Sequence, residues 1–310
     1  MLIFRGLHST GKTPVALTIG NFDGVHLGHQ ALLKQLRMAA QKLELPTAVL
    51  VFEPHPREFF TPQEAPVRLT NMREKLEFFA TLGVDRVYVC RFNSSFAQMS
   101  ATDFIHALSD KLAAQFVLIG DDFRFGNRRS GDIALMEKIG GQLGLEVEIM
   151  HRVSHNDIRI SSTAVRAALS KGDLRAAQRY LGRPYSISGR VVHGDGLGRQ
   201  LGFPTANIQL KHNRPPLTGI FVVRAQGDGF PSMQGVASLG VRPTVKQNGK
   251  PVLEVHLFDF SGEIYNKHLR VDFLHKLRDE VKYLDLQSLT QQIELDVCNA
   301  KQWFIQHDGL

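Results

Sequence analysis

The chain has 310 residues, of which 43% are hydrophobic and 22% are charged, and this balance excludes a disordered or fibrous protein. The length favours two domains. No apolar run approaches the roughly 20 residues that span a bilayer, and the first 14 residues do not resemble a signal peptide, so we expect no membrane association. Two cysteines cannot build a disulfide framework and fit a reducing, cytoplasmic setting. The net charge of +7 contains no basic block, which suits anionic ligands such as nucleotides and argues against nucleic acid.

Apolar strands alternate with amphipathic helices through the first half of the chain. Strands are predicted at residues 15–20, 47–52, 86–90, 116–120 and 145–150, and helices at 28–43, 73–82, 101–113 and 131–142. This alternation predicts a Rossmann-like, doubly wound parallel sheet. Each strand is a continuous apolar run, as expected when helices cover both faces of the sheet.

The pattern changes near residue 185, after two short helices predicted within residues 165–181. Six short strands without intervening helices are predicted at residues 185–192, 202–208, 219–225, 233–239, 252–258 and 268–273. Such a series predicts a small six-stranded antiparallel barrel, and the apolar spacing of residues 286–304 predicts a terminal helix. We therefore expect an α/β domain at residues 1–184 and a β domain at residues 185–310.

The segment GNFDGVHLGH, residues 20–29, lies between the first predicted strand and the first helix. Unpaired N–H groups at a helix N-terminus bind phosphate. His26 and His29 are three residues apart, so they share a helix face and can both donate to a phosphoryl group in the transition state. For an isolated His-x-x-His, structural histidines are an equally good reading, but the strand-to-helix context favours a site.

Late in the same domain, ISSTAVR at residues 160–166 combines hydroxyl groups at a helix start with an arginine in the first turn. Ser162, Thr163 and Arg166 could form a second phosphate clamp. Taken alone, a serine cap with a surface arginine would be the simpler interpretation.

Two more loops follow predicted strands, where parallel sheets bind ligands. They are FEPHP at residues 52–56 and GDDFRFG at residues 120–126. Phe123 and Phe125 could enclose a planar ring between them, although core packing explains such residues equally well in isolation.

The second domain opens with a glycine-rich run, GRVVHGDGLGRQLGFPTAN, at residues 189–207. Its glycines would let a loop close over phosphates, but the run lacks the lysine of a P-loop. Thr205 and Asn207 alternate along a strand and point the same way, so their oxygens could hold Mg²⁺ on a nucleotide. An ordinary barrel turn is the competing interpretation.

These motifs, in this order, resemble the family of bacterial bifunctional riboflavin kinase/FAD synthetases. The first half is similar to the HxGH nucleotidyltransferases, and the glycine-rich run is similar to the riboflavin kinase signature. Further similar segments are residues 219–221, 235–244 and 253–259. The resemblance covers residues 14–304 and implies two reactions: ATP phosphorylates riboflavin to FMN, and a second ATP adenylylates FMN to FAD with release of pyrophosphate.

The resemblance also implies roles for individual residues. In the first domain, His26, His29 and Arg166 would be catalytic and Asp122, Phe123 and Phe125 would bind flavin, while ATP would be held by Gly20, Asn21, Phe22, Asp23, His26, His29, Ser162, Thr163 and Arg166. In the second domain, Glu254 would be the general base for the ribityl hydroxyl. There, ATP would be held by Gly189, Gly196, Gly198, Thr205 and Asn207, the last two through Mg²⁺, and flavin by Arg278 and Glu280.

Three segments of the chain depart from the pattern of the family that it resembles. Relatives carry asparagine at Asp122, an Asn-Ile-Gly turn at residues 238–240, and Tyr-Gly at residues 265–266. The last two would affect the loop geometry near the kinase site.

Three alternatives stay open from the sequence. One is an HxGH transferase acting on a pantetheine, nicotinamide or glycerol phosphate, which the second domain disfavours. Another is an aminoacyl-tRNA synthetase, which should carry a KMSKS-like loop that the chain lacks. The third is a flavin carrier that has lost turnover. We expect a monomer or weak homo-oligomer.

Overall fold

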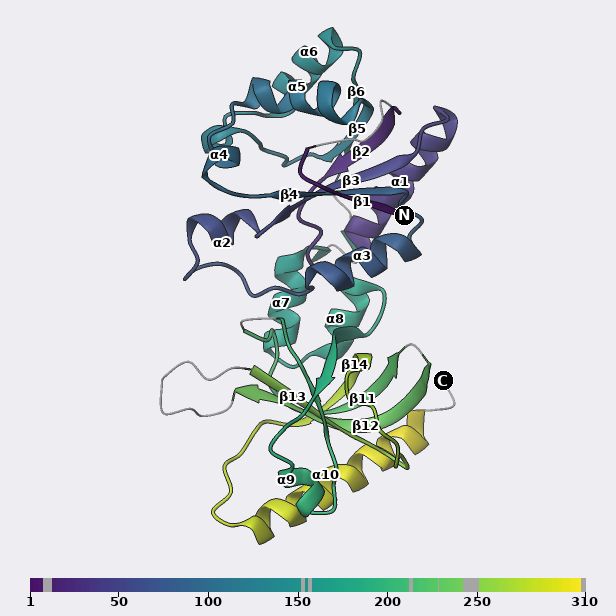
Figure 1. The fold of residues 1–310 in the computed structure, drawn as a ribbon, viewed down its shortest axis with the longest axis vertical. Coiled ribbons are helices and arrows are strands. Elements are labelled where there is room, and N and C mark those ends of the chain that lie inside the picture. Colours follow the sequence, from purple (N-terminus) through teal and green to yellow (C-terminus); the bar gives the residue numbers. More distant parts are fainter. Residues whose placement is uncertain are drawn as a thin grey trace. The chain divides into compact units, whose positions relative to one another are not determined.

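The computed structural model describes residues 1–7, 13–151, 154–155, 158–211, 214–227, 229–241 and 251–307 (Figure 1). The chain forms two compact units, and each is described by itself. The first comprises Met1–Pro66 and Lys75–Ser161, and the second comprises Val67–Glu74 and Ser162–Leu310. The two helices that precede residue 184 thus belong with the barrel. The expected boundary between the two activities at residues 184 and 185 stays a prediction.

The first unit is built on a parallel six-stranded sheet in the order β1-β4-β3-β2-β5-β6. The strands are β1 (Leu2–Arg5), β2 (Val15–Ile19), β3 (Thr47–Glu53), β4 (Arg86–Arg91), β5 (Ala114–Gly120) and β6 (Glu146–Met150). Five of them confirm the predicted strands. Strand β1 was missed because it is short and mostly exposed at the sheet edge, so it lacks a buried apolar run. Residues 154–155 and 158–159 add a small hairpin, β7 and β8.

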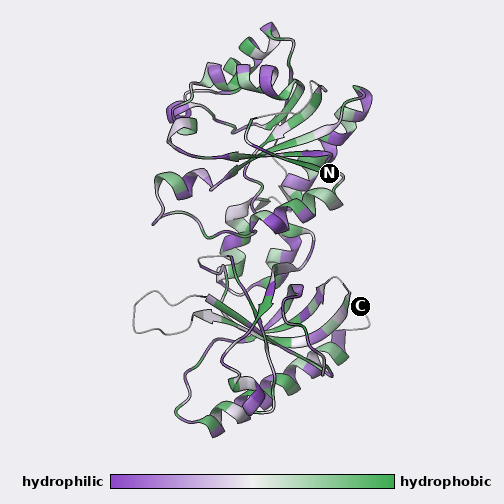
Figure 2. Ribbon diagram, in the orientation of Figure 1, coloured by the Kyte–Doolittle hydropathy of each residue, from purple (hydrophilic) through white to green (hydrophobic). Residues whose placement is uncertain are grey.

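Helices cover both faces of this sheet, as the sequence predicts. The helices are α1 (Leu27–Lys42), α2 (Pro56–Phe60), α3 (Met72–Thr81), α4 (Ser94–Ala97), α5 (Ala101–Leu112) and α6 (Ile133–Gln142). Leu36 of α1 packs with Ala16 of β2, while Leu108 of α5 packs with the neighbouring Leu17. Because successive strand residues point to opposite faces, these two contacts lie on opposite sides of the sheet. The central strands β2, β3 and β5 are accordingly largely apolar, whereas β1 and β6 carry charged residues (Figure 2).

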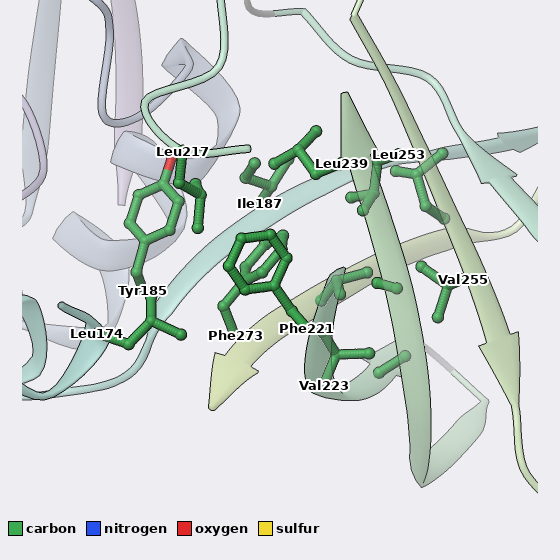
Figure 3. Close-up of a cluster of buried hydrophobic side chains, with 14 of the residues drawn as sticks. Leu174, Tyr185, Ile187, Leu217, Phe221, Val223, Leu239, Leu253, Val255 and Phe273 are labelled. Carbon is green, nitrogen blue, oxygen red and sulfur yellow. The ribbon is translucent and has the colours of Figure 1, made fainter. Parts of the chain in front are cut away.

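The second unit contains a closed antiparallel barrel in the order β10-β13-β12-β11-β14-β9. Its strands are β9 (Tyr185–Val192), β10 (Ala206–Ile208), β11 (Gly219–Gly227), β12 (Phe230–Val241), β13 (Pro251–Leu257) and β14 (His268–Arg278). All six were predicted, but β10 is shorter than expected, because residues 202–205 form a turn and a loop. Aromatic and aliphatic side chains, including Phe221 and Phe273, fill the barrel interior (Figure 3).

Four helices complete the second unit. They are α7 (Ser162–Ser170), α8 (Leu174–Leu181), α9 (Leu197–Gln200) and the terminal α10 (Leu286–His307). Helix α8 packs against β9 and β14. Ala300 and Phe304 of α10 pack on Val222, Val236 and Phe258, which lie on the outer wall of the barrel. Among the described residues, no helix is long and apolar enough to cross a membrane.

Candidate active sites

The HxGH segment folds into a tight loop that starts helix α1. His26 is the N-cap, and its Nδ1 accepts a hydrogen bond from the backbone N–H of His29 at 3.3 Å. The two imidazole rings stack with centroids 3.6 Å apart and planes 18° apart, which confirms that they share a face. A Cβ at Gly28 would lie 3.1 Å from the His26 ring, so glycine there lets this stack form.

The environment of His29 favours its neutral form. Phe22 packs on its ring at 5.0 Å, and its Nδ1 is buried without a hydrogen-bond partner among the described residues. Burial lowers the pKa of His29 well below its ordinary value, and the positive charges of His26 and Lys75 lower it further. A neutral imidazole at pH 7 can donate a hydrogen bond without carrying a full charge.

A cavity of about 590 Å³ opens at the carboxyl ends of the central strands. Gly20 and Asn21 after β2, Phe52 in β3 and Phe123 after β5 all line it. Strands β2 and β5 are neighbours in the sheet: the chain adds β3 and β4 on one side of this pair and β6 on the other. Doubly wound sheets bind ligands at such a switch point. The lining is aromatic with a basic rim, formed by Phe60, Phe92, Phe96, Phe104, Phe125, Arg57, Arg124, Arg128 and Arg129. The cavity therefore suits a ligand that joins a planar ring to a negatively charged group.

The predicted enclosure of a ring between Phe123 and Phe125 is wrong for this structure. The two rings stack on each other at 5.4 Å, and Phe125 is buried against Phe104. A ring between them would need about 7 Å, two contact distances. Both side chains instead line one wall of the cavity, together with the exposed Asp122.

The second predicted phosphate element begins helix α7 in the second unit. Ser162 and Thr163 occupy its first turn, and Arg166 follows one turn later. The Nε of Arg166 donates to the backbone oxygen of Val67 at 2.6 Å, which fixes part of the guanidinium. Because the two units are described separately, the approach of this element to the histidines stays a prediction.

Asn207 and Glu254, two residues predicted for the kinase site, lie on the outer wall of the barrel. Asn207 of β10 pairs with Glu254 of β13, and Glu254 pairs in turn with Ser238 of β12. Leu253 and Val255, which flank Glu254, are buried in the barrel interior. Strand alternation therefore turns the carboxylate outward, on the same side as the amide of Asn207.

Two cavities meet at Thr205, just before β10. One, of about 250 Å³, is lined by Glu254, Ser238, Gly198 and residues of helix α10. The other, of about 270 Å³, is lined by Arg199, Tyr265 and the segment 260–264. In the second cavity Tyr265 stacks on His193 at 3.9 Å. Two adjoining cavities that share one hydroxyl could hold two substrates side by side.

Arg278 and Glu280 line the first of these cavities. Arg278 makes a two-pronged salt bridge to the buried Asp296 of α10, at 2.8 and 2.6 Å. This bond raises the pKa of the Arg278 guanidinium. Glu280 accepts a bond from Ser238 Oγ at 3.3 Å. The serine that replaces the family's asparagine thus contacts a predicted flavin residue.

The predicted glycines divide into two groups. Gly198 lines a cavity, and Gly196 caps helix α9 in a left-handed conformation. Gly189 instead lies buried where β9 crosses the chain after β10, and a Cβ there would collide with the backbone of Gln209. Gly189 lines none of these three cavities, and its predicted contact with ATP stays a prediction. The last residues of the predicted 235–244 motif, 242–244, lie outside the described part of the chain.

Asn266 shows how the turn beside Tyr265 forms without the glycine of the family's Tyr-Gly pair. Its φ angle is +63°, a left-handed conformation. Asparagine is one of the few residues other than glycine that adopts it readily, so the turn beside Tyr265 is kept.

Sequence reasoning missed several residues at these sites. Lys75 looked like a surface lysine on a predicted helix, yet it is buried beside His29. Asp296 resembled any polar residue of the terminal helix, although it holds Arg278. Arg128 and Arg129 have positive φ angles, a backbone feature without a pattern in the sequence. Of the residues at these sites, Tyr265 could have been found from the sequence, because it precedes Asn266, which replaces the glycine of the family pattern.

The fold and sites define a transferase with a nucleotidyltransferase α/β unit and a kinase barrel. Residues 8–164 match the FAD synthetase family and residues 181–304 match the riboflavin kinase family. The chain is similar to bifunctional riboflavin kinase/FMN adenylyltransferases of Haemophilus influenzae (46% identity, 98% of this chain and 99% of the relative) and Escherichia coli (44%, 98% of each). A solved structure described as a macrolide-efflux protein from Streptococcus pneumoniae is 28% identical, with a TM-score of 0.81 over 96% of this chain and 97% of that one.

The chain belongs to the family of bifunctional riboflavin kinase/FMN adenylyltransferases. Riboflavin kinase and FMN adenylyltransferase are therefore its two enzymatic activities, with ATP as co-substrate and FMN and FAD as products. This assignment disfavours the other HxGH transferases and the aminoacyl-tRNA synthetases.

Proposed function

We propose that riboflavin is phosphorylated on the outer wall of the barrel, with Glu254 as the general base. The pairing of Asn207 with Glu254 beside Thr205 is the observation that carries this assignment. Glu254 takes the proton of the ribityl hydroxyl as its oxygen attacks the γ-phosphorus of ATP, and ADP leaves. Flavin occupies the cavity that Arg278 and Glu280 line, and ATP occupies the adjoining cavity beside Tyr265.

FMN is then adenylylated in the first unit. The isoalloxazine ring lies against the aromatic wall of the 590 Å³ cavity, near Asp122, Phe123 and Phe125. The FMN phosphate attacks the α-phosphorus of a second ATP, and pyrophosphate leaves. His26 and His29 donate hydrogen bonds to the oxygens that gain charge. Positioning and electrostatics do most of the work in such transfers.

Mg²⁺ is the cation that we assign to the kinase site. Thr205 and Asn207 would contribute a hydroxyl and an amide oxygen, which suit this hard ion, while phosphates and water complete its shell. Thr205 lies at the junction of the two cavities, where the ATP phosphates would lie, so the donor set fits the group. When bound, Mg²⁺ neutralises phosphate charge.

We also infer a cytoplasmic monomer or weak homo-oligomer. Cys90 and Cys298 are both free thiols, which suits a reducing compartment.

A chromatographic time course with riboflavin, ATP and Mg²⁺ tests these assignments. FMN should appear first and FAD second. FMN alone would show an inactive first unit, and FAD only from added FMN would show an inactive barrel. Bound flavin without turnover would support the carrier alternative.

A further inference from the structure

The first turn of helix α3 ends with a lysine, Lys75, whose positive charge is unfavourable at a helix N-terminus. Asn71 Oδ1 accepts a bond from the N–H of Glu74 at 3.0 Å, and Glu74 Oε2 accepts from the N–H of Asn71 at 2.7 Å. This reciprocal capping starts the helix at Met72 and places Lys75 at the end of its first turn. The positive end of the helix dipole repels a cation there. Lys75 is also only 5% exposed, so its ammonium loses hydration.

The lysine reaches the loop that carries the histidines. Its Nζ donates to the backbone oxygen of Asn21 at 2.8 Å. Asn21 opens a loop in which Phe22 and Val25 have φ angles of +48° and +42°. A positive φ is rare for a β-branched residue and persists only when surrounding contacts hold it.

A second side chain holds the other end of the same loop. Gln30 Nε2 donates to the backbone oxygen of Val25 at 2.9 Å. The loop is therefore fixed at one end by a buried cation and at the other by a neutral amide. A charged donor makes a stronger hydrogen bond than a neutral one, so Lys75 should contribute more to this loop than Gln30 does.

We propose that Lys75 is a positioning residue for adenylyl transfer: its ammonium fixes the Asn21 carbonyl and thereby the loop from which His26 and His29 act on ATP. The Oδ1 of Asn21 supports this, because it is a buried acceptor without a partner among the described residues and Asn21 lines the cavity. The charge of Lys75 also helps keep His29 neutral. The inference rests on the proposed roles of the two histidines.

Three variants separate the effect of the Lys75 charge from the effect of loop packing. They are Lys75→Met, Lys75→Arg and Gln30→Leu. In the full-length chain, Lys75→Met should lower kcat/KM for FAD formation from FMN and Mg-ATP about 10- to 100-fold, the effect expected for losing a charged hydrogen bond. Lys75→Arg should restore most of it. Gln30→Leu should have a smaller effect, below about 10-fold, because it removes a neutral bond.

Two further readouts distinguish positioning from a structural role. FMN formation from riboflavin should stay within about twofold, which shows that the variant is folded, and any fall in Tm should be matched by Gln30→Leu, which removes the other bond to the same loop. Unchanged FAD formation, or a joint loss of both activities with a lower Tm, would overturn the inference. If the methionine variant does not fold, Lys75→Gln serves the same test.

His29→Ala in the same assay separates the two ways of failing. If His29→Ala keeps FAD formation, the proposed adenylylation site is wrong. If His29→Ala loses it while Lys75→Met does not, only the inference about Lys75 fails.

Discussion

The α/β unit and the barrel place catalytic groups in different ways. In the α/β unit, His26 and His29 lie on a strained loop at the end of β2, and the cavity opens where the parallel strands end. In the barrel, Glu254 and Asn207 lie in mid-strand and point outward, because apolar side chains fill the interior. In a sheet that is covered on both faces, a ligand can bind at the carboxyl ends of the strands. In a barrel whose interior is filled, it can bind on the outer wall.

The two units also differ in the bonds that hold their proposed catalytic residues in place. The loop in the α/β unit depends on side-chain bonds from Lys75 and Gln30, while the barrel residues are fixed by ladder hydrogen bonds. Substitutions should therefore affect one activity at a time.

The largest effect is expected for Glu254→Gln. Loss of the general base should lower riboflavin phosphorylation by about 10²- to 10⁴-fold. FAD formation from added FMN should be unchanged, which also shows that the variant is folded. Persistent FMN formation would mean that another group takes the proton.

The converse substitution, His29→Ala, should lower FAD formation by about 10²-fold or more, since one transition-state donor is lost. FMN formation should survive. His106→Ala, which removes an exposed histidine of α5 in the same unit, is the matched control and should leave both activities unchanged.

Asp296→Asn tests the support of Arg278. The carboxylate is 6% exposed and carries the salt bridge, so its loss should destabilise the chain by about 1–3 kcal/mol and raise the KM for riboflavin. Chemical denaturation and kinase kinetics measure the two effects. Glu294→Gln, an exposed acid on the same helix, should change neither.

The pH dependence of stability should report His29. Its pKa in the folded chain is lowered, so below about pH 6.5 the unfolded chain binds a proton that the folded chain does not. Stability from this group is present above that pH and is lost as the pH falls toward the folded pKa. The loss is at most about 1.4 kcal/mol per pH unit. His29→Asn should flatten the profile between pH 6.5 and 5, and an identical slope would contradict this account.

The smallest effect concerns the thiols. Burial raises the pKa of Cys90 to about 11, whereas Cys298 is exposed on α10. Mass spectrometry after alkylation at pH 7.5 should find Cys298 modified and Cys90 intact. Labelling of Cys90 at a similar rate would show that the sheet opens readily.

The sequence predicted the elements with strong periodicity and the motifs with their own local geometry. Strand β1 was missed because it is exposed, and of the strand predicted at 202–208 only the last three residues form β10, after a turn and a loop. The placement of His26 and His29 on the same face followed from helix spacing, although the stacking of their rings was not predicted. The burial of Phe125 against Phe104 and the burial of Lys75 did not follow, because both depend on tertiary packing between segments distant in sequence.

The central claim is that one chain holds two separate active sites, and mixing two inactivated variants tests it most directly. His29→Ala alone should stop at FMN, and Glu254→Gln alone should leave riboflavin unchanged. An equal mixture of the two, given riboflavin, ATP and Mg²⁺, should make FAD as FMN passes from one chain to the other. FAD from either variant alone, or none from the mixture although each variant keeps its remaining activity, would contradict the account.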